Sequence, residues 1–269
     1  MVKKLYKHEF LYYTRIMGIV YTILLTMATA NRIIQCFESD TVAYRIVSIF
    51  SGITYGVSVA AAFGFAFVLG IVRFYRNLFT CEGYLSFTLP VTPRQHITVK
   101  AVTAVCVDAV TLLVVLISGC IVAAGEMLKE IFVALGYLLR KLYELVGSHM
   151  ITVSLEFVLL MIVAAFSGVL LYYTFISIGQ LFKKNRIMAA VGAYFAYYVL
   201  TQIVSAVITI VFSVLAANGA LEQVAVWIME HIAASVHIGM WGLIGFMAIF
   251  AAIEFSVVKH IITKKLNLE

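Results

Sequence analysis

Six apolar runs, each long enough to cross a lipid bilayer, are the feature that most constrains the fold of this chain. Crossing the hydrocarbon core takes about 20 predominantly apolar residues in a helix, because only helices and closed barrels satisfy their own backbone polar groups in lipid. We therefore predict an all-α integral membrane protein, with residues 1–269 forming a single transmembrane domain. The six predicted spans lie at approximately Ile16–Cys36, Ile46–Val72, Ile97–Ala124, Ile151–Phe182, Ile187–Ala217 and Val236–Ile262.

The composition excludes water as the main solvent of this protein. Of its 269 residues, 64% are hydrophobic and 12% are charged, whereas soluble domains carry about 25% charged residues. The net charge is +6, but the lysines and arginines lie between apolar runs and do not gather in one stretch. This distribution argues against nucleic-acid binding. The four cysteines form no CxxC pair and have no histidine at metal-ligand spacing, so we interpret them as packing residues. We expect no cleaved signal peptide, because the first apolar run is long enough to remain as a span.

The placement of lysine and arginine predicts the orientation, since cytoplasmic loops carry an excess of both close to the spans. Six spans put both termini on one side, and fourteen of the 19 basic residues fall there. They are Lys3, Lys4, Lys7, Arg15, Arg73, Arg76, Arg94, Lys100, Lys183, Lys184, Arg186, Lys259, Lys264 and Lys265. The opposite side holds Arg32, Arg45, Lys129, Arg140 and Lys141. We therefore predict a multi-pass protein of the plasma membrane with cytoplasmic N- and C-termini.

Three segments are too polar or too short to span. Met1–Arg15 intersperses basic and apolar residues, a pattern typical of an interfacial helix, and we interpret it as an elbow helix leading into the first span. Glu126–Val146 places six charged residues near helical spacing against six aliphatic or aromatic ones, which predicts an amphipathic helix on the outer surface. Asn218–Ser235 is short and mostly apolar, and we expect it to dip into the outer interface without crossing.

Motifs that would make the chain an enzyme are missing from the sequence. A phosphate-binding loop needs a Gly-Lys dipeptide, and the chain contains none. The closest approach to a zinc protease motif is HEFLY at His8–Tyr12, in which Tyr12 occupies the position of the second histidine. There is no GxSxG nucleophile motif. We therefore predict no catalytic residue, no metal site and no cofactor in this chain.

Three acidic residues lie inside predicted spans, where a charge is costly and is by default a functional hypothesis. They are Asp108 in the third span, Glu156 near the outer start of the fourth, and Glu254 in the inner half of the sixth. One interpretation is a proton or cation pathway through the bundle. The other, which we favour because no lysine or arginine is matched to these acids inside the membrane, is interhelical hydrogen bonding, snorkelling or subunit contact.

The loop between the second and third spans is the most distinctive cytoplasmic segment. It reads RFYRNLFTCEGYLSFTLPVTPRQHITVKA from Arg73 to Ala101 and holds the chain's only prolines, Pro90 and Pro93. The amphipathic stretch Leu78–Leu89 ends at these prolines, which restrict the backbone, so it is suited to act as a short rigid lever. An ordinary solvated loop is the alternative, yet Leu78, Phe79, Tyr84, Leu85, Phe87 and Leu89 are apolar enough to require lipid or a protein partner.

This loop resembles the corresponding loop of bacterial ABC-2-type transporter permeases, in which EGYL…TLP precedes a basic entry to the third span. The terminal KKLNLE at Lys264–Glu269 and the basic-aromatic opening segment are also similar to that family. The resemblance implies an N-terminal elbow helix, six spans and a coupling helix that docks on a separate ATP-binding subunit. That coupling helix falls on Thr80, Cys81, Glu82, Gly83, Tyr84, Leu85, Ser86, Phe87, Thr88 and Leu89, with Glu82 facing basic groups of the ATPase and the aromatic residues filling its cleft.

By this resemblance the chain is the membrane-spanning subunit of an ATP-driven exporter of a peptide, lipid-like or drug-like amphipathic substrate. Its partners would be two ATP-binding subunits, which hold ATP and magnesium, a second permease copy or paralogue, and membrane lipid, but no nucleic acid. One departure affects the substrate class: the family's outer helices commonly lie between the fifth and sixth spans, whereas the larger insertion here follows the third. Two alternatives remain, an ion-coupled secondary transporter using Asp108, Glu156 and Glu254, and a membrane sensor or scaffold for antimicrobial peptides.

Overall fold

The structure is a computed structural model that describes residues 2–37, 39–88, 90–182 and 184–264, apart from the side chains of Leu85 and Phe87. The described part of the chain is helical throughout and contains no strand. The predictions made for Met1, Leu89, Lys183 and the C-terminal motif beyond Lys264 lie outside these residues.

The expectation of six membrane-spanning helices is confirmed at the level of length and composition, because six candidate spans occur in the described chain. Five of them correspond to single helices, and the fourth candidate, Glu126–Gly179, combines an amphipathic helix with the apolar helix that follows it. The long apolar helices are α1 (Val2–Cys36), α2 (Val42–Phe79), α4 (Pro93–Val122), α6 (Met150–Gly179), α7 (Arg186–Ala217) and α9 (Ile232–Lys264).

The shorter helices fall in the segments that the sequence set apart from the spans. The amphipathic helix α5 (Glu126–Val146) has the bounds that its charge pattern predicted, and α8 (Glu222–Glu230) lies within the short apolar segment before the last span. A single 3-10 turn, η1 (Gly147–His149), separates α5 from α6. The loop after α2 contains the helix α3 (Cys81–Thr88).

The elbow helix is not a separate element in this structure. Instead, α1 runs without a break from Val2 to Cys36, so the predicted boundary at Arg15 is wrong as a helix boundary. The physical reason is that the sequence offers no glycine or proline before Gly18 to end the helix. The basic opening segment therefore forms the first turns of the first long helix.

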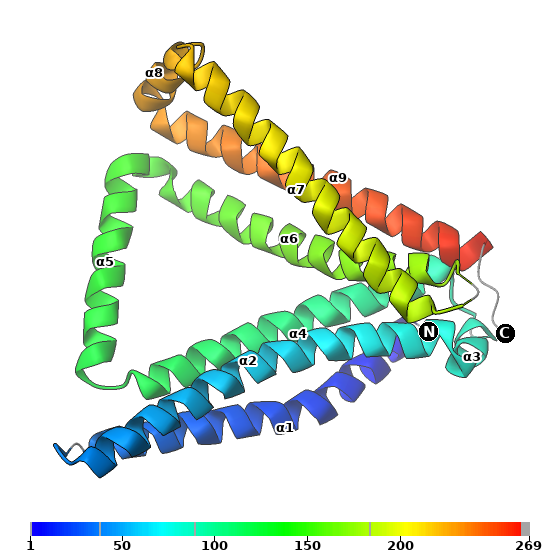
Figure 1. The fold of residues 1–269 in the computed structure, drawn as a ribbon, viewed down its shortest axis with the longest axis horizontal. Helices are drawn as coiled ribbons and strands as arrows, with labels where there is room; N and C mark the ends of the chain where they lie inside the picture. Colours follow the sequence, from blue (N-terminus) through cyan, green and yellow to red (C-terminus); the bar gives the residue numbers. More distant parts are fainter. Residues whose placement is uncertain (1, 38, 89, 183, 265–269) are drawn as a thin grey trace. The chain divides into compact units, whose positions relative to one another are not determined.

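The chain divides into two compact units, Met1–Tyr137 and Leu138–Glu269, which are described separately. In unit 1, α1, α2 and α4 pack against one another and α3 packs against the end of α2 (Figure 1). Its apolar core includes Tyr13, Met17, Ala66 and Val107. In unit 2, α6 packs along α9 and also against α7 (Figure 1).

Local sequence signals explain where α4 begins. At α4, the Thr92 hydroxyl accepts from the Gln95 backbone amide while the Gln95 side chain accepts from the Thr92 amide, a reciprocal capping box. Pro93 occupies the first turn, where its missing N–H costs no helical hydrogen bond. These signals fix the start of α4 and thereby the position of the residues that follow in its first two turns.

Candidate functional site

A buried carboxylate between two cations lies where three helices of unit 1 meet. Lys100 of α4 donates from Nζ to Glu9 Oε1 over 2.7 Å, and both side chains are only 3% exposed. Arg73 of α2 donates from Nε to Glu9 Oε2 over 3.0 Å and from Nη2 to Oε1 over 3.4 Å. Glu9 of α1 is thus held by charge-assisted hydrogen bonds from both neighbouring helices.

The helical repeat explains why Glu9 faces inward. Glu9, Tyr13 and Met17 follow one another at four-residue intervals, so they share one face of α1, and all three are buried. Tyr12, on the adjacent face, lies under the Arg73 guanidinium at 4.1 Å from the ring centroid. This cation–π contact adds a second attachment between α1 and α2.

A second acidic residue extends this arrangement to α3. Glu82 accepts from Arg76 Nη2 over 3.2 Å, and its other oxygen lies 3.9 Å from Arg73 Nη1. Arg73 therefore contacts both a buried and a partly exposed carboxylate. We call Glu9, Arg73, Arg76, Glu82 and Lys100 the ionic cluster.

The exposed and the buried pairs of the ionic cluster contribute differently to the stability of the fold. The side chains of Arg76 and Glu82 are 59% and 42% exposed, and exposed pairs of this kind contribute about 0–1 kcal/mol. Glu9 and Lys100 are withdrawn from water, so removing one partner leaves an uncompensated charge at a cost of roughly 3–5 kcal/mol. The buried half fixes the helices, while the exposed half attaches α3 more weakly.

The helix α3 has one buried and one exposed face. Gly83 and Ser86 are buried, whereas Cys81, Tyr84 and Thr88 are exposed at helical spacing, and Tyr84 is 52% exposed. The turn from α2 is closed by the Thr80 hydroxyl, which donates to the Arg76 carbonyl over 2.5 Å, and by the Gly83 amide, which donates to the Thr80 carbonyl. This geometry leaves Cys81, Tyr84 and Thr88 on the outer face of α3.

Two apolar residues of the loop need no partner. The sequence suggested that Leu78 and Phe79 require lipid or another protein, but they are 0% and 5% exposed and end α2 within unit 1. Phe79 meets Phe74 edge-to-face at 5.7 Å between ring centroids. That part of the expectation is wrong because α2 continues seven residues beyond the predicted span end at Val72. Of the predicted coupling residues, Thr80–Thr88 lie in the described chain and Leu89 does not.

The acidic residues predicted inside spans have different surroundings. Asp108 on α4 is partly buried and makes no hydrogen bond or ion pair with any residue that the structure describes. Glu254 on α9 is 7% exposed and accepts from the Ser167 hydroxyl of α6 over 3.2 Å. Both remain without a cationic partner in the described chain.

Glu156 is different because it has a histidine partner that sequence reasoning missed. His237 Nδ1 of α9 lies 2.8 Å from both Glu156 oxygens, and the Trp241 indole donates to Oε1 over 2.9 Å. His149 meets His237 edge-to-face at 5.4 Å. Since His237 and Trp241 are four residues apart on α9, this spacing was the available signal for a shared partner.

Glu156 and Glu254 belong to separate places along the α6–α9 pair. Glu156 is eleven residues from Ser167, the partner of Glu254, along α6, which corresponds to about 16 Å of helix rise. The structure therefore does not join these two acids in one site.

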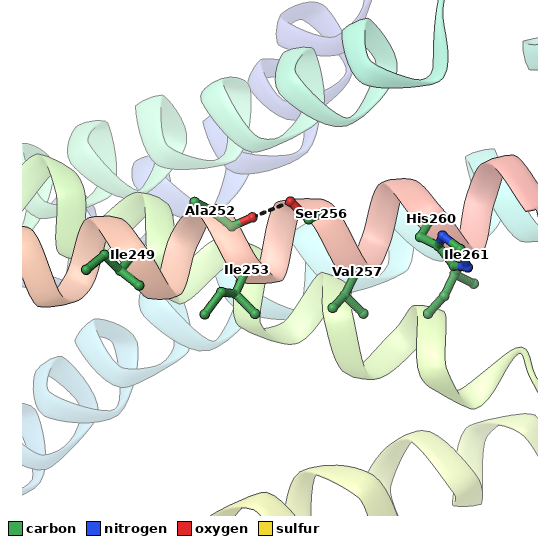
Figure 2. A pocket seen from close by; sticks show the side chains of 7 residues that line it. All are labelled: Ile249, Ala252, Ile253, Ser256, Val257, His260 and Ile261. Carbon is green, nitrogen blue, oxygen red and sulfur yellow. Dashed lines mark hydrogen bonds between the residues drawn. The ribbon is translucent and has the colours of Figure 1, made fainter.

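The grooves of the two units offer no catalytic constellation. In unit 2, a groove of about 570 Å³ follows one face of α9, where Ser256 donates to the Ala252 carbonyl of its own helix and His260 is the titratable residue (Figure 2). In unit 1, an apolar groove of about 550 Å³ lies among α2, α4 and the start of α5. Within the described chain, no group of histidine, cysteine and acidic residues has the geometry to hold a metal ion.

Comparison with known proteins gives no assignment: no family model, no curated protein and no solved structure matches this chain. The fold by itself supports the class of multi-pass helical membrane proteins, through six helices of the described chain that are long and apolar enough to span a membrane.

Proposed function

We propose that this chain is the membrane-spanning subunit of an ABC-2-type transporter in a bacterial plasma membrane, with both termini in the cytoplasm. A separate ATP-binding subunit, present in two copies, would bind ATP and magnesium and hydrolyse the nucleotide. A second copy of the chain or a paralogue would complete the pathway. The proposal is supported by the resemblance of the segment from Tyr75 to Ala101 and by the way α3 is attached to unit 1.

The observation that carries the proposal is the connection of α3 to three long helices through the ionic cluster. Glu82 of α3 contacts Arg73 and Arg76 of α2, and Arg73 also holds Glu9 of α1, which binds Lys100 of α4. A force on α3 would therefore reach α1, α2 and α4 through hydrogen-bonded contacts. A solvated loop would need no such attachment.

In this mechanism, closure of the ATP-binding subunits presses on α3, and the three helices of unit 1 move as a group because their charges stay paired. The movement would open a path for an amphipathic peptide, lipid-like or drug-like substrate toward the outside. Rigid-body motion of packed helices of this kind is an established way to switch between two states. Export follows from the resemblance, since the family consists mostly of exporters.

The position of Glu82 refines which residues meet the ATPase. Because Glu82 is paired within the chain, the exposed residues Cys81, Tyr84 and Thr88 are the first contacts in this proposal. Glu82 would then orient α3 instead of providing the main charge contact predicted from the sequence.

Copurification tests whether an ATP-binding partner exists. The tagged chain is extracted from native membranes in mild detergent, and the bound proteins are identified by mass spectrometry. We expect a soluble nucleotide-binding protein in stoichiometric amount, lost in the Tyr84→Asp variant and retained in the matched control Tyr137→Asp on α5. Recovery of the chain without any nucleotide-binding protein would sink the proposal.

A charge swap separates the two roles of Glu82. Glu82→Lys should reduce ATPase activity of the reconstituted complex several-fold, because it places three cations together. If Glu82 acts by orienting α3, adding Arg76→Glu should restore most of that activity. If Glu82 instead contacts the ATPase directly, the double variant should remain as impaired as Glu82→Lys alone.

One observation favours the alternative of ion-coupled transport, namely the partly buried Asp108 without a partner among the described residues. Under this alternative, substrate uptake into vesicles would follow an imposed proton or sodium gradient without ATP, and Asp108→Asn would abolish it. Under the main proposal, transport requires ATP and Asp108→Asn retains it.

A further inference from the structure

The helix α5 carries a broad apolar surface that no neighbouring helix covers. Every residue from Lys129 to Leu145 is exposed, and Val146 is the only buried residue of the helix. The side chains include Phe132 at 61% exposure and Leu138 at 56%. A surface of this size on a protein is covered by something in its working environment.

The charged residues of α5 share one face. At about 100° per residue, the six charged side chains fall within an arc of about 120°. They are Glu126, Lys129, Glu130, Arg140, Lys141 and Glu144. The remaining arc of about 240° carries no charged residue. It contains Ile131, Phe132, Leu135, Leu138, Leu142 and Leu145. An apolar arc wider than half the helix fits a continuous apolar phase better than the narrow seam of a helix pair.

The polar face of α5 is electrically neutral, which restricts what can cover the apolar face of this helix. Its three acidic and three basic residues balance, and Arg140 donates toward Glu144 over 3.4 Å within the same helix. A helix that binds anionic lipid or an acidic protein carries an excess of lysine and arginine. Binding by α5 would therefore depend on buried apolar area and not on the charge of the headgroups.

Both ends of α5 are turns formed by glycines with positive φ, which separate it from the spans on either side. Gly125 (φ +108°) lies between α4 and α5, and a β-carbon there would approach Arg32 Nη2 at 3.0 Å. Gly147 (φ +61°) opens the turn between α5 and α6. Because these conformations are strained for other residues, the two glycines mark turns that separate α5 from the long apolar helices α4 and α6.

We propose that α5 lies along the membrane surface with its apolar arc inserted into the lipid interface and its neutral polar arc toward water. Its 21 residues would cover about 31 Å of that surface. Lipid is the occupant because the apolar arc is wide, the polar arc is neutral, and the helices on either side, α4 and α6, are apolar and long enough to span a membrane. The inference does not depend on the proposed function.

Spin labelling of the full chain tests this orientation. The four native cysteines, all exposed and unbridged, are replaced by serine, and one cysteine is introduced at Leu135 or at Glu130. Each variant is labelled with a nitroxide and reconstituted, without any other protein, into vesicles of phosphatidylcholine. Collision rates with oxygen, which concentrates in lipid, and with a water-soluble nickel chelate then report the surroundings of each label.

We expect the Leu135 label to favour oxygen over nickel several-fold more than the Glu130 label, and the pair Leu138 and Glu144 to repeat the contrast. Adding phosphatidylglycerol should leave the ratios unchanged, because the polar arc is neutral. Equal ratios at Leu135 and Glu130 would overturn the proposal. A Leu135 label shielded from both reagents would overturn it as well, since a second copy of the chain would then cover the apolar arc.

Discussion

The two units of this protein hold buried glutamates in different ways. In unit 1, Glu9 is bound by Lys100 and Arg73, so its charge is balanced by full positive charges on two other helices. In unit 2, Glu254 is also buried but accepts from the neutral hydroxyl of Ser167. The difference shows that the same residue type serves as an electrostatic junction in one unit and as a hydrogen-bond acceptor in the other.

This contrast has an energetic basis. Ionised groups withdrawn from water are tolerated only when paired, and breaking such a pair costs more than the pair contributes. A single hydrogen bond to a neutral group contributes about 0.5–1.5 kcal/mol. Substitutions in unit 1 should therefore be more damaging than equivalent ones in unit 2, with the exception of steric changes at the α6–α7 contact.

The largest effect is expected for Glu9→Ala. Removing this carboxylate leaves the buried Lys100 without its partner and Arg73 with only the more distant Glu82. This should cost roughly 3–5 kcal/mol and lower the apparent Tm in detergent, measured by intrinsic fluorescence. Glu126→Ala on the exposed start of α5 is the matched control and should leave Tm unchanged. The double variant Glu9→Leu with Lys100→Met should lose less stability than the two single changes together, because only Arg73 then lacks its buried partner.

Gly179→Ala should have the next largest effect. A β-carbon at Gly179 would lie 2.6 Å from the Arg186 carbonyl oxygen and 2.7 Å from the Ala190 β-carbon, so α7 must shift away from α6 at a cost of about 1–3 kcal/mol. Proteolysis between α6 and α7 measures the loosening. Gly168→Ala on the same helix meets nothing within 4 Å, and faster cleavage in that control would contradict the steric explanation.

A smaller effect, about 1–2 kcal/mol, is expected for His237→Leu. The substitution leaves Glu156 with the Trp241 indole as its remaining donor, and an under-satisfied carboxylate is destabilising. His237→Gln retains a donor and should recover about half of the lost stability. If His237→Leu and His237→Gln have the same Tm in detergent, a hydrogen bond from residue 237 to Glu156 does not contribute to stability.

The smallest effect is expected for Glu254→Gln. The amide oxygen can still accept from Ser167, and no cation among the described residues loses a partner, so stability should change by less than about 1 kcal/mol. Glu9→Gln, measured beside it, should be clearly more destabilising. Equal losses of stability in Glu254→Gln and Glu9→Gln would contradict the proposed difference between the two units.

The sequence predicted the elements of this fold better than the contacts among them. The apolar runs located the six long helices, and the charge spacing of Glu126–Val146 located α5 to the residue, because both are local patterns. Glu9, Arg73 and Lys100 carried no such pattern: Glu9 is separated by 64 residues from Arg73 and by 91 from Lys100. In the sequence, Arg73 and Lys100 serve only as topology signals, and the packing of α1, α2 and α4 shows that both bind the buried Glu9.

The sequence does contain a local signal for the inward position of Glu9. Glu9 lies on the same helical face as Tyr13 and Met17, which would have indicated an inward carboxylate if the first fifteen residues had been read as part of the first long helix. The predicted elbow boundary at Arg15 separated Met17 from Glu9 and Tyr13. Asp108 makes no ion pair with any residue that the structure describes, and its role stays a prediction.

The separation of Glu9 from Lys100 has a consequence for how the protein is made. At roughly 5–20 residues per second, the 91 residues between them correspond to roughly 5–20 s during which the first helix exists without the lysine that balances its carboxylate. The Glu9–Lys100 contact cannot form until α4 has been made, so the order of synthesis sets the earliest moment at which unit 1 closes.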